Sequence, residues 1–482
     1  MMRNPVFMLA RLGLYLLAFA LPPLVVGAYA TSAAISSRYA PQPTPAIAEL
    51  PTTPTHDPDK PTAVVLLGAS GAQITDVLAP YEVLSAAGAF NVYAVAPERQ
   101  LVPLSVGLGV IPHLSLAELD QRLAGQAPAV IVVPAMPGVG GPAHQPIADW
   151  LRAHAGNNTI LLSICNGADV LAEAKLLDGR RATANWMALD LWERKYPATQ
   201  WIRGQRYVED GNIVTAAGVT SGIDGTLHVI GKLLGVDVAD ATSTAMGYPH
   251  PELTASPAIP STQFEVSDLI FPLNAAYGWD RPTIGVAIGE GVGEIQVASI
   301  LDAYTGQSFA ADTVTVASER GTVRSAHDLN LVPRYGLDDA PVLDRLIALG
   351  DASVDPVTGT WAKARGLDLE PLPMDGAERF AFDAALSDMA KRINVPSAQF
   401  AAKALEWPTV PAYPGDGLHL SGPGWPWALA LRPTALGLLG LFLAVGLDRS
   451  LVARRHRAKS SAVNSAPTDV GLTSAMTLQS AR

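Results

Sequence analysis

A single thiol stands between a strand-like run and a helix-like run of the sequence. Cys165 is the only cysteine among the 482 residues, so the chain cannot form an intramolecular disulfide. The apolar run TILLSI, residues 159–164, precedes it, and Asn166, Gly167 and Ala168 open a helical pattern after it. This order predicts a tight turn from strand to helix, with the thiol at the helix N-terminus.

Such a turn has a chemical use. The N-terminus of a helix carries unpaired N–H groups and a partial positive charge, and both favour a thiolate over a thiol. We therefore expect the pKa of Cys165 to be lowered and its sulfur to be a nucleophile. The same N–H groups can stabilise an oxyanion. The alternative is that Cys165 is a small, buried apolar residue without reactivity.

The elements around this turn alternate between strand and helix patterns over residues 61–246. The runs TAVVLLG, FNVYAVAP, AVIVVPA, TILLSI and NIVTAAG read as buried strands, and amphipathic helical patterns separate most of them. This alternation predicts an α/β fold, a flavodoxin-like parallel sheet sandwiched by helices. Ligands of such sheets bind at the carboxyl ends of the strands, which is where Cys165 lies.

Three motifs resemble the DJ-1/PfpI family of the class I glutamine amidotransferase-like superfamily. They are SICNGADVLAEAKLLDGRRATANW (163–186), GNIVTAAGVTSGID (211–224) and ITDVLAPYEVL (74–84). The resemblance is nearest to the amidotransferase-like domains of AraC-type regulators and to isonitrile hydratases. It implies that Cys165 is the nucleophile and Asp76 its acidic partner. Without the resemblance, Asp76 would be interpreted as a helix cap or an exposed helix residue.

Two asparagines depart from the family pattern. Asn185 stands in Ala-Asn-Trp where relatives commonly have Thr-His-Trp, and asparagine cannot accept a proton as a general base. Asn166 follows the thiol where isonitrile hydratases usually have threonine. We expect both asparagines to position a ligand or an oxyanion by hydrogen bonds. Neither His144 nor His228 is a convincing replacement for the missing base.

A glycine-containing turn is the expected oxyanion side of the site. The segment VVPAMPGVGG, residues 132–141, stands where the family has a Pro-Gly-Gly turn. Ala135 replaces the first of those glycines. The resemblance therefore implies that Gly138 or Gly140 takes over the oxyanion-binding position.

A second block repeats part of the first. Residues 282–341 align with residues 61–120 at a constant offset of 221, without a gap. The block, residues 282–407, lacks a counterpart of the thiol-bearing turn. We therefore predict two tandem copies of the fold, the second shortened and degenerate, which implies a homodimer or an internal pseudo-dimer. Pro-rich linkers are expected at residues 31–60, 247–281 and 408–424.

Both ends of the chain are apolar. Residues 1–30 predict a transmembrane helix or a cleaved signal peptide, since Ala28-Tyr29-Ala30 resembles a cleavage site. Residues 425–447 predict a transmembrane helix, and the arginines of the tail, residues 448–482, place that tail in the cytoplasm. The main domains should then be extracytoplasmic and anchored to the cell membrane.

Composition narrows the partners. The net charge is −11 and no basic stripe stands out, so we expect no direct nucleic-acid contact. No cluster of histidine, cysteine and acidic residues has metal-ligand spacing, and GEGVGE (289–294) lacks a nucleotide fingerprint, so no metal and no cofactor are expected. Two hypotheses remain for a small-molecule substrate or ligand. One is a cysteine-dependent hydrolase or hydratase that acts on a small electrophile, and the other is a ligand-binding or sensing module.

Overall fold

The computed structural model of the chain describes residues 5–40, 50–156, 158–249, 256–349, 355–372, 380–408 and 418–464. It divides into two compact units: Tyr29–Leu429, and the terminal segments Met1–Ala28 with Ala430–Arg482. Within the first of these units, we call residues 62–249 the first lobe and residues 266–408 the second lobe.

The first lobe is built on a seven-stranded sheet in the order β10-β11-β7-β6-β1-β2-β5. All neighbouring strands run parallel except β10 and β11, which confirms the predicted α/β fold with a parallel sheet. The strands are β1 (Thr62–Leu66), β2 (Asn91–Ala96), β5 (Leu114–Ser115), β6 (Val130–Val133), β7 (Ile160–Ile164), β10 (Tyr207–Asp210) and β11 (Ile213–Ala216). A separate short pair joins β8 (Arg181–Ala182) and β9 (Gln200–Trp201).

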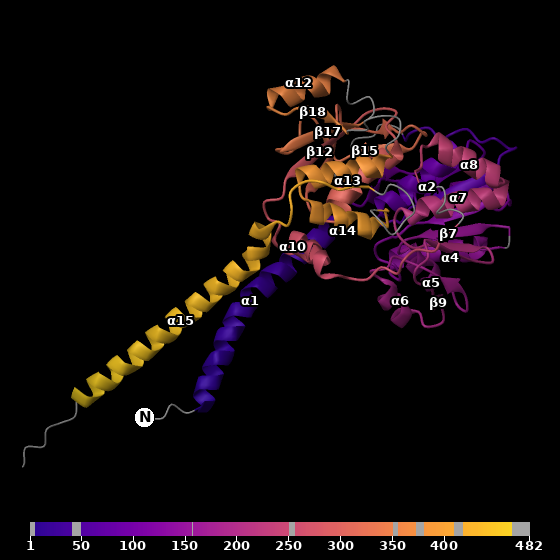
Figure 1. Cartoon of the computed structure of the whole chain (residues 1–482). Helices are drawn as coiled ribbons and strands as arrows, with labels where there is room; N and C mark the ends of the chain where they lie inside the picture. Colours follow the sequence, from indigo (N-terminus) through magenta and orange to yellow (C-terminus); the bar gives the residue numbers. More distant parts are fainter. Residues whose placement is uncertain are drawn as a thin grey trace, which may run out of the picture. The chain divides into compact units, whose positions relative to one another are not determined.

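Helices cover both faces of this sheet. In β1, Ala63 and Val65 join the apolar cluster of one face, and Val64 and Leu66 join that of the other, so every strand residue is buried. Figure 1 shows β7 between α7 on one side and α4 and α5 on the other. One face carries α2 (Ile74–Ala86), α7 (Ser221–Leu234) and α8 (Val236–Ala245); the other carries α3 (Leu116–Leu123), the 3₁₀ turn η1 (Pro142–His144), α4 (Gln145–His154), α5 (Gly167–Glu173) and α6 (Leu189–Lys195).

The second lobe has a five-stranded sheet in the order β16-β13-β12-β17-β18, and every pairing in it is parallel. Its strands are β12 (Thr283–Ile288), β13 (Asp312–Ala317), β16 (Tyr335–Gly336), β17 (Arg345–Leu349) and β18 (Leu369–Pro371). Its helices are η2 (Val266–Leu269), α10 (Ile270–Tyr277), α11 (Glu294–Leu301), the π-helical turn η3 (Asp302–Gly306), α12 (Pro356–Ala364), α13 (Ala381–Arg392) and α14 (Val395–Leu405).

A four-stranded antiparallel sheet joins the lobes in the order β14-β15-β4-β3. Its central pair sets Val110 of β4 opposite Leu331 of β15, the residue 221 positions later in the chain. The strands are β3 (Val102–Leu104), β4 (Leu108–Ile111), β14 (Val323–Arg324) and β15 (Asn330–Pro333). A single apolar cluster contains side chains of both lobes, and α2 packs against α11 within it.

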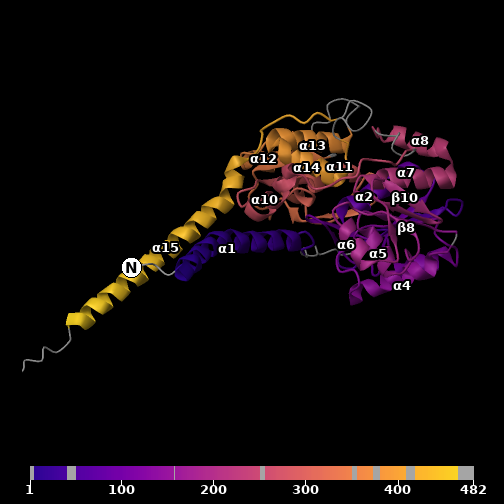
Figure 2. The ribbon, with the colours of Figure 1, turned by 60° about the horizontal axis from the view of Figure 1, so that its bottom comes forward.

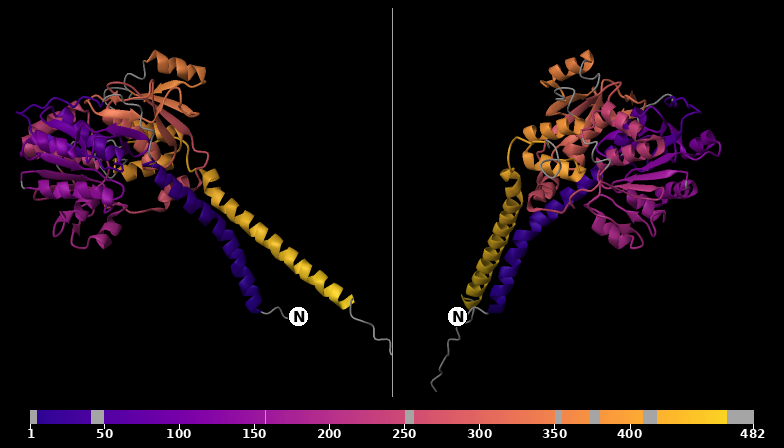
Figure 3. Two further views of the ribbon diagram at one scale, coloured as in Figure 1. Left: turned by 180° about the vertical axis from the view of Figure 1, so that it is seen from behind. Right: turned by 45° about the vertical axis from the view of Figure 1, so that its right-hand side comes forward.

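The two ends of the chain form long helices, α1 (Pro5–Ser37) and α15 (Trp427–Asn464). By length and composition, each is apolar enough to cross a membrane. The hydroxyl of Tyr15 donates to Asp448 Oδ2 at 2.7 Å, and Arg11 pairs with the same carboxylate. A Cβ added at Gly437 would meet Phe19, so α1 and α15 contact each other in antiparallel orientation. Figures 2 and 3 show both helices along their length.

Both terminal helices extend beyond the segments predicted for them. Residues 31–37 were expected in a linker, but α1 continues through them to Ser37 because the sequence TSAAISS has no glycine or proline. Likewise α15 continues past residue 447 to Asn464, through a stretch rich in alanine and arginine, which are good helix formers. Most of the linker predicted at 408–424 and the end of the tail, from residue 465, lie outside the described residues.

Candidate active site around Cys165

The predicted turn from strand to helix is present at Cys165. β7 ends at Ile164, α5 begins at Gly167, and Cys165 adopts a left-handed backbone with φ of 56°. A non-glycine residue in this region is strained, and such strain collects at functional sites. The Cys165 N–H donates to the carbonyl of Ala216 at 3.0 Å, which fixes the turn to β11.

Gly167 is required by the crowding at this turn. A Cβ added there would lie 2.0 Å from the carbonyl oxygen of Val133, at the end of β6. No side chain fits at that distance, so helix α5 can approach the sheet only with glycine at this position. Gly167 therefore relieves the crowding at this turn.

The thiol of Cys165 is not activated in the way that we predicted. Its side chain is buried, with 5% exposed. Burial raises the pKa of Cys165 well above its ordinary value, and the nearby Asp76 carboxylate raises it further. The Asn166 N–H opposes both effects by hydrogen bonding to the sulfur. The expected lowering of this pKa is therefore wrong, because burial and acidic neighbours outweigh the terminus of a helix only seven residues long.

Asp76 lies in the first turn of α2 and is fully buried. Its N–H donates to the side-chain oxygen of Gln73 at 2.8 Å, and its Oδ2 accepts the N–H of Ala135 at 3.0 Å. Among the described residues, its Oδ1 has no hydrogen-bond partner. Burial raises the pKa of Asp76 well above its ordinary range. The hydrogen bond from the Ala135 N–H opposes this shift, and the charge of Asp302 adds to it. Asp76 is therefore neither an exposed helix residue nor a helix cap.

The two asparagines make structural hydrogen bonds. Asn166 Oδ1 accepts the indole N–H of Trp192 at 3.1 Å. Asn185 is buried, and its Oδ1 accepts the backbone N–H of Met187 at 3.0 Å. In both cases the acceptor oxygen is already used. The position where relatives commonly carry histidine thus supports a turn of the chain.

The glycines of the predicted oxyanion turn adopt left-handed backbone conformations. Gly138 and Gly140 adopt positive φ values of 75° and 84°. A Cβ added at Gly138 would meet no atom within 4 Å, and one at Gly140 would meet Glu173. The oxyanion-binding role of Gly138 or Gly140 stays a prediction. The residue of this segment that contacts the site is Ala135, through its N–H to Asp76.

His144 and His228 have neighbours other than Cys165. His144 is buried, which lowers its pKa, and its electrostatic neighbours are Asp169 and Glu173. His228 contacts Glu209 at 2.7 Å on the outer side of α7. Neither histidine has Cys165 as an electrostatic neighbour in the described part of the chain.

Two acidic residues of the second lobe complete the surroundings of the thiol, and sequence reasoning missed both. Asp302 accepts hydrogen bonds of 2.5 Å from the side chains of Gln73 and Thr75, at the start of α2. It lies within an apolar helical run, ASILDAY, and that exception is the signal that could have found it. The charges of Asp302 and Glu406 both raise the pKa of Cys165, after burial and Asp76.

Glu406 reaches the first lobe from the end of α14. It adopts a left-handed backbone with φ of 56°, and its Oε2 accepts the hydroxyl of Ser221 at 2.5 Å. A Cβ added at Gly218 would lie 2.4 Å from the Glu406 carboxyl carbon, so glycine leaves room for this carboxylate. Burial raises the pKa of Glu406 to about 7, although the charge of Arg206 opposes the shift.

The segment that follows α1 forms another wall of the site. A Cβ added at Gly71 would lie 2.9 Å from the ring of Tyr39. The guanidinium of Arg38 lies 4.4 Å from the ring centre of Phe309 and donates to the carbonyl of Gly306. The charges of Asp76 and Cys165 raise the pKa of Tyr39, after burial, so its hydroxyl is near both groups.

The first lobe is similar in sequence to proteins of a known family. Residues 62–232 match the model of the DJ-1/PfpI family. The chain is similar to an isonitrile hydratase of Pseudomonas putida, at 33% identity over 36% of this chain and 74% of the hydratase. It is also similar to the HTH-type transcriptional regulator CdhR of Pseudomonas aeruginosa, at 35% identity over 27% of this chain, but it spans only 35% of that regulator.

Among solved structures, a DJ-1 superfamily protein from Salmonella typhimurium aligns with 39% of this chain and 99% of its own length. The sequence identity is 22% and the TM-score is 0.34.

Proposed function

The chain belongs to the DJ-1/PfpI family, and from this premise we propose that Cys165 and Asp76 add water to a small, uncharged electrophile of the isonitrile class. The observation that carries the proposal is Asp76 Oδ1, which is fully buried near a strained cysteine and has no hydrogen-bond partner among the residues that the structure describes. A buried polar atom without a partner is unfavourable unless a ligand completes it. The similarity to an isonitrile hydratase supports the choice of electrophile.

The protonation states of the two groups fit this chemistry. Both pKa values are raised by burial, which favours the neutral acid form of Asp76 and the thiol form of Cys165. Asp76 Oδ2 accepts the Ala135 N–H, which leaves Oδ1 to carry the acidic proton. An O–H at that position is a donor directed at a bound ligand, and it serves as a general acid. A hydrolase that requires a thiolate and a histidine is less well supported.

The proposed reaction has two stages. First, Asp76 Oδ1 gives its proton to the terminal carbon of the isonitrile, the Cys165 sulfur bonds to the same carbon, and the thiol proton passes to Asp76. Second, water adds to that carbon of the thioimidate, the carbon–sulfur bond breaks, and Cys165 recovers a proton. The product is the N-substituted formamide. Proton donation and acceptance by one carboxyl group replaces the missing histidine base.

A ligand-binding or sensing role is the second candidate. Asn185 is bonded to the backbone of Met187 and cannot take a proton, so no histidine base is available at the family position. The similarity to a transcriptional regulator agrees with such a role. In this case the same free Oδ1 of Asp76 would hold the ligand without a bond to sulfur.

We further propose that the second lobe is a shortened copy of the first and acts as its internal partner. Val110 pairs with Leu331, and this offset of 221 residues is the one that aligns the two blocks of sequence. In an isologous interface, equivalent residues of the two copies face each other at the twofold axis. Val110 and Leu331 would be such equivalent residues. In this arrangement the second lobe would supply Asp302 and Glu406 to the site of the first.

Membrane anchorage through α1 and α15 is also proposed, with the lobes on the extracytoplasmic side. Apolar length supports spanning, and the antiparallel contact of the helices puts both chain ends on one side. The cluster Arg449, Arg454, Arg455 and Arg457 supports a cytoplasmic location for that side.

Turnover of an alkyl isonitrile tests the proposal. The full chain in detergent is expected to release the formamide, detected by mass spectrometry, and Cys165→Ser and Asp76→Asn are each expected to lose at least 100-fold in rate. Asp190→Asn, an exposed carboxylate outside the site, is the matched control. Ligand-induced thermal stabilisation without formamide, retained in Cys165→Ser, would favour the sensing role. If the chain shows no turnover and no thermal stabilisation by the ligand, both candidate functions are overturned.

A further inference from the structure

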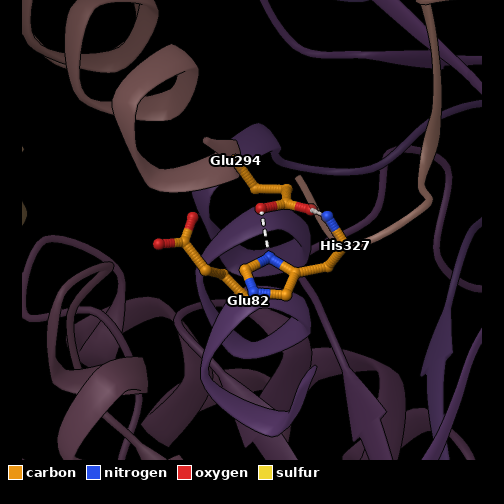
Figure 4. Close-up of side chains that lie close together, drawn as sticks. All are labelled: Glu82, Glu294 and His327. Atoms are coloured by element: carbon orange, nitrogen blue, oxygen red, sulfur yellow. Dashed lines mark hydrogen bonds and ion pairs between the residues drawn. The ribbon is translucent and has the colours of Figure 1, made fainter. Parts of the chain in front are cut away.

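Three metal-ligating side chains meet between the lobes, away from Cys165. Glu82 lies near the end of α2, Glu294 opens α11, and His327 belongs to the loop between β14 and β15. One ligand atom of each lies within 4.8 Å of the other two. Figure 4 shows Glu294 and His327 joined by dashed lines, with the side chain of Glu82 beside them. The sequence separations of 212 and 33 residues explain why spacing did not reveal them.

Further hydrogen bonds hold two of these side chains in place. Glu82 Oε2 accepts the N–H of Ile295 at 2.7 Å. Glu294 Oε1 accepts the hydroxyl of Ser325 at 2.6 Å, and its Oε2 lies 2.9 Å from His327 Nδ1. Such outer contacts orient carboxylates and imidazoles for coordination.

The two carboxylates of the cluster have few cationic partners. Glu294 is fully buried, and its only ion pair among the described residues is with His327. No lysine or arginine pairs with Glu82 or Glu294 in that part of the chain. Glu294 is buried and Glu82 is half-buried. Two carboxylates brought this close repel each other, and a cation bound between them relieves that repulsion.

The location independently indicates a ligand site. α11 follows the central strand β12 of the second sheet, as α2 follows β1 of the first. The cluster therefore lies at the carboxyl end of a parallel sheet, where α/β folds bind ligands. A cavity of about 430 Å³ is lined by His327 together with Tyr81, Ala326 and Asp328. His327 is therefore the member of the cluster that borders this cavity.

We propose that Glu82, Glu294 and His327 bind a divalent transition-metal ion, Zn²⁺ being the chemically best match, which bridges the two lobes. The imidazole ligand distinguishes this site from the all-oxygen sites of Mg²⁺ and Ca²⁺. Three protein ligands with one open position are the pattern of an accessible zinc site. The site is independent of the addition chemistry proposed for Cys165.

Zinc titration of the purified full chain tests this proposal. Isothermal calorimetry in a Cys165→Ala background, which removes thiol binding, is expected to give one Zn²⁺ per chain. Glu294→Gln and His327→Ala are each expected to weaken binding by more than about 100-fold, since even outer-contact changes cost 10–100-fold. Glu82→Gln, which preserves size, provides a third variant if either of the others fails to fold.

The matched control is the His228–Glu209 pair, a second histidine–carboxylate contact of 2.7 Å that also involves Lys232. Glu209→Gln is expected to leave zinc affinity unchanged. Zinc is also expected to raise the melting temperature of the chain, and not that of Glu82→Gln. The proposal would be overturned if zinc does not bind stoichiometrically, or if all three cluster variants bind zinc as tightly as the Cys165→Ala parent.

Discussion

Acidic side chains surround the thiol at the scale of single residues. Asp76 belongs to the first lobe, while Asp302 and Glu406 come from the second, and all three raise the pKa of Cys165. In water such carboxyls would be charged, but burial raises the pKa of each of them. A carboxyl group whose neutral form is favoured can donate a hydrogen bond, so the site suits ligands that accept hydrogen bonds without carrying negative charge.

Alkylation of the thiol should report this environment directly, because Cys165 is the only cysteine. The rate with iodoacetamide is expected to rise only above about pH 8.5, the ordinary thiol value. Asp76→Asn removes the carboxylate that raises the thiol pKa, so its labelling profile should move to lower pH. Wild-type labelling that is half-maximal well below pH 8.5 would contradict this account.

Glu406 should make stability depend on pH. Its pKa is about 7 in the folded chain against an ordinary value of 4.5. Between these values the unfolded chain loses the proton and the folded chain keeps it, so the free energy of unfolding falls as pH rises. The decrease attributable to Glu406 is at most about 3 kcal/mol, at about 1.4 kcal/mol per pH unit.

Urea unfolding at pH 4.5 and pH 7.5 measures this effect. Glu406→Gln cannot ionise, so its unfolding free energy should fall less over that interval than that of the wild type. Asp76 and Glu82 also have raised pKa values and contribute with the same sign in both proteins. Parallel profiles for the two chains would show that Glu406 is not protonated in the fold.

Gly167→Ala tests the crowding at the turn. The added methyl would lie 2.0 Å from the Val133 carbonyl oxygen, a backbone atom that cannot rotate away. The expected loss is about 1–3 kcal/mol in unfolding free energy, as for other overpacked sites. Gly156→Ala is the control, since no atom lies within 4 Å of its added Cβ, and a change within about 0.5 kcal/mol is expected. Equal effects would exclude a special role for Gly167.

At the scale of elements, local patterns were predictable and contacts between lobes were not. The strand before Cys165 and the helix after it follow from adjacent residues, TILLSI and NGADVL. Asp302 and Glu406 reach the site only because the lobes dock, across 137 and 241 residues from Cys165. Glu294 and His327 were not predicted as metal ligands for the same reason, since Glu82 belongs to the other lobe. The pKa of Cys165 was mispredicted because burial depends on this docking, whereas a helix terminus is visible in sequence.

Leu331→Ala tests whether the joining sheet couples the lobes. Leu331 is fully buried opposite Val110, and removal of its side chain is expected to cost about 2–5 kcal/mol. Hydrogen exchange should accelerate in peptides of β3 and β4, in the other lobe, as well as in β15. Val342→Ala, at a side chain that is 92% exposed, should change neither. Acceleration confined to the second lobe would contradict coupling.

At the scale of the whole molecule, the two terminal helices suggest how the chain is oriented in a membrane. α1 and α15 contact each other in antiparallel orientation through Asp448 and Gly437. If both span the membrane, the two chain ends share one side and the lobes lie on the other. The proposed orientation puts the arginines of the last turns of α15, from Arg449 to Arg457, on the cytoplasmic side.

Impermeant maleimide labelling of intact cells measures this topology. In a Cys165→Ala background, a cysteine introduced at Gln100 should be labelled from outside, whereas one at Arg457 should react only after lysis. Both positions are at the surface of the structure. Labelling of Arg457→Cys from outside, with protection of Gln100→Cys, would reverse the proposed orientation.

The antiparallel pairing of β4 with β15 has a further consequence, because both strands belong to one polypeptide. Two separate subunits associate by mass action, so dilution or low expression leaves unpaired copies. Covalent linkage replaces the bulk concentration of a partner by a fixed effective concentration. Each thiol therefore always has its set of second-lobe carboxyls, in a constant ratio of one to one, however few molecules a cell makes.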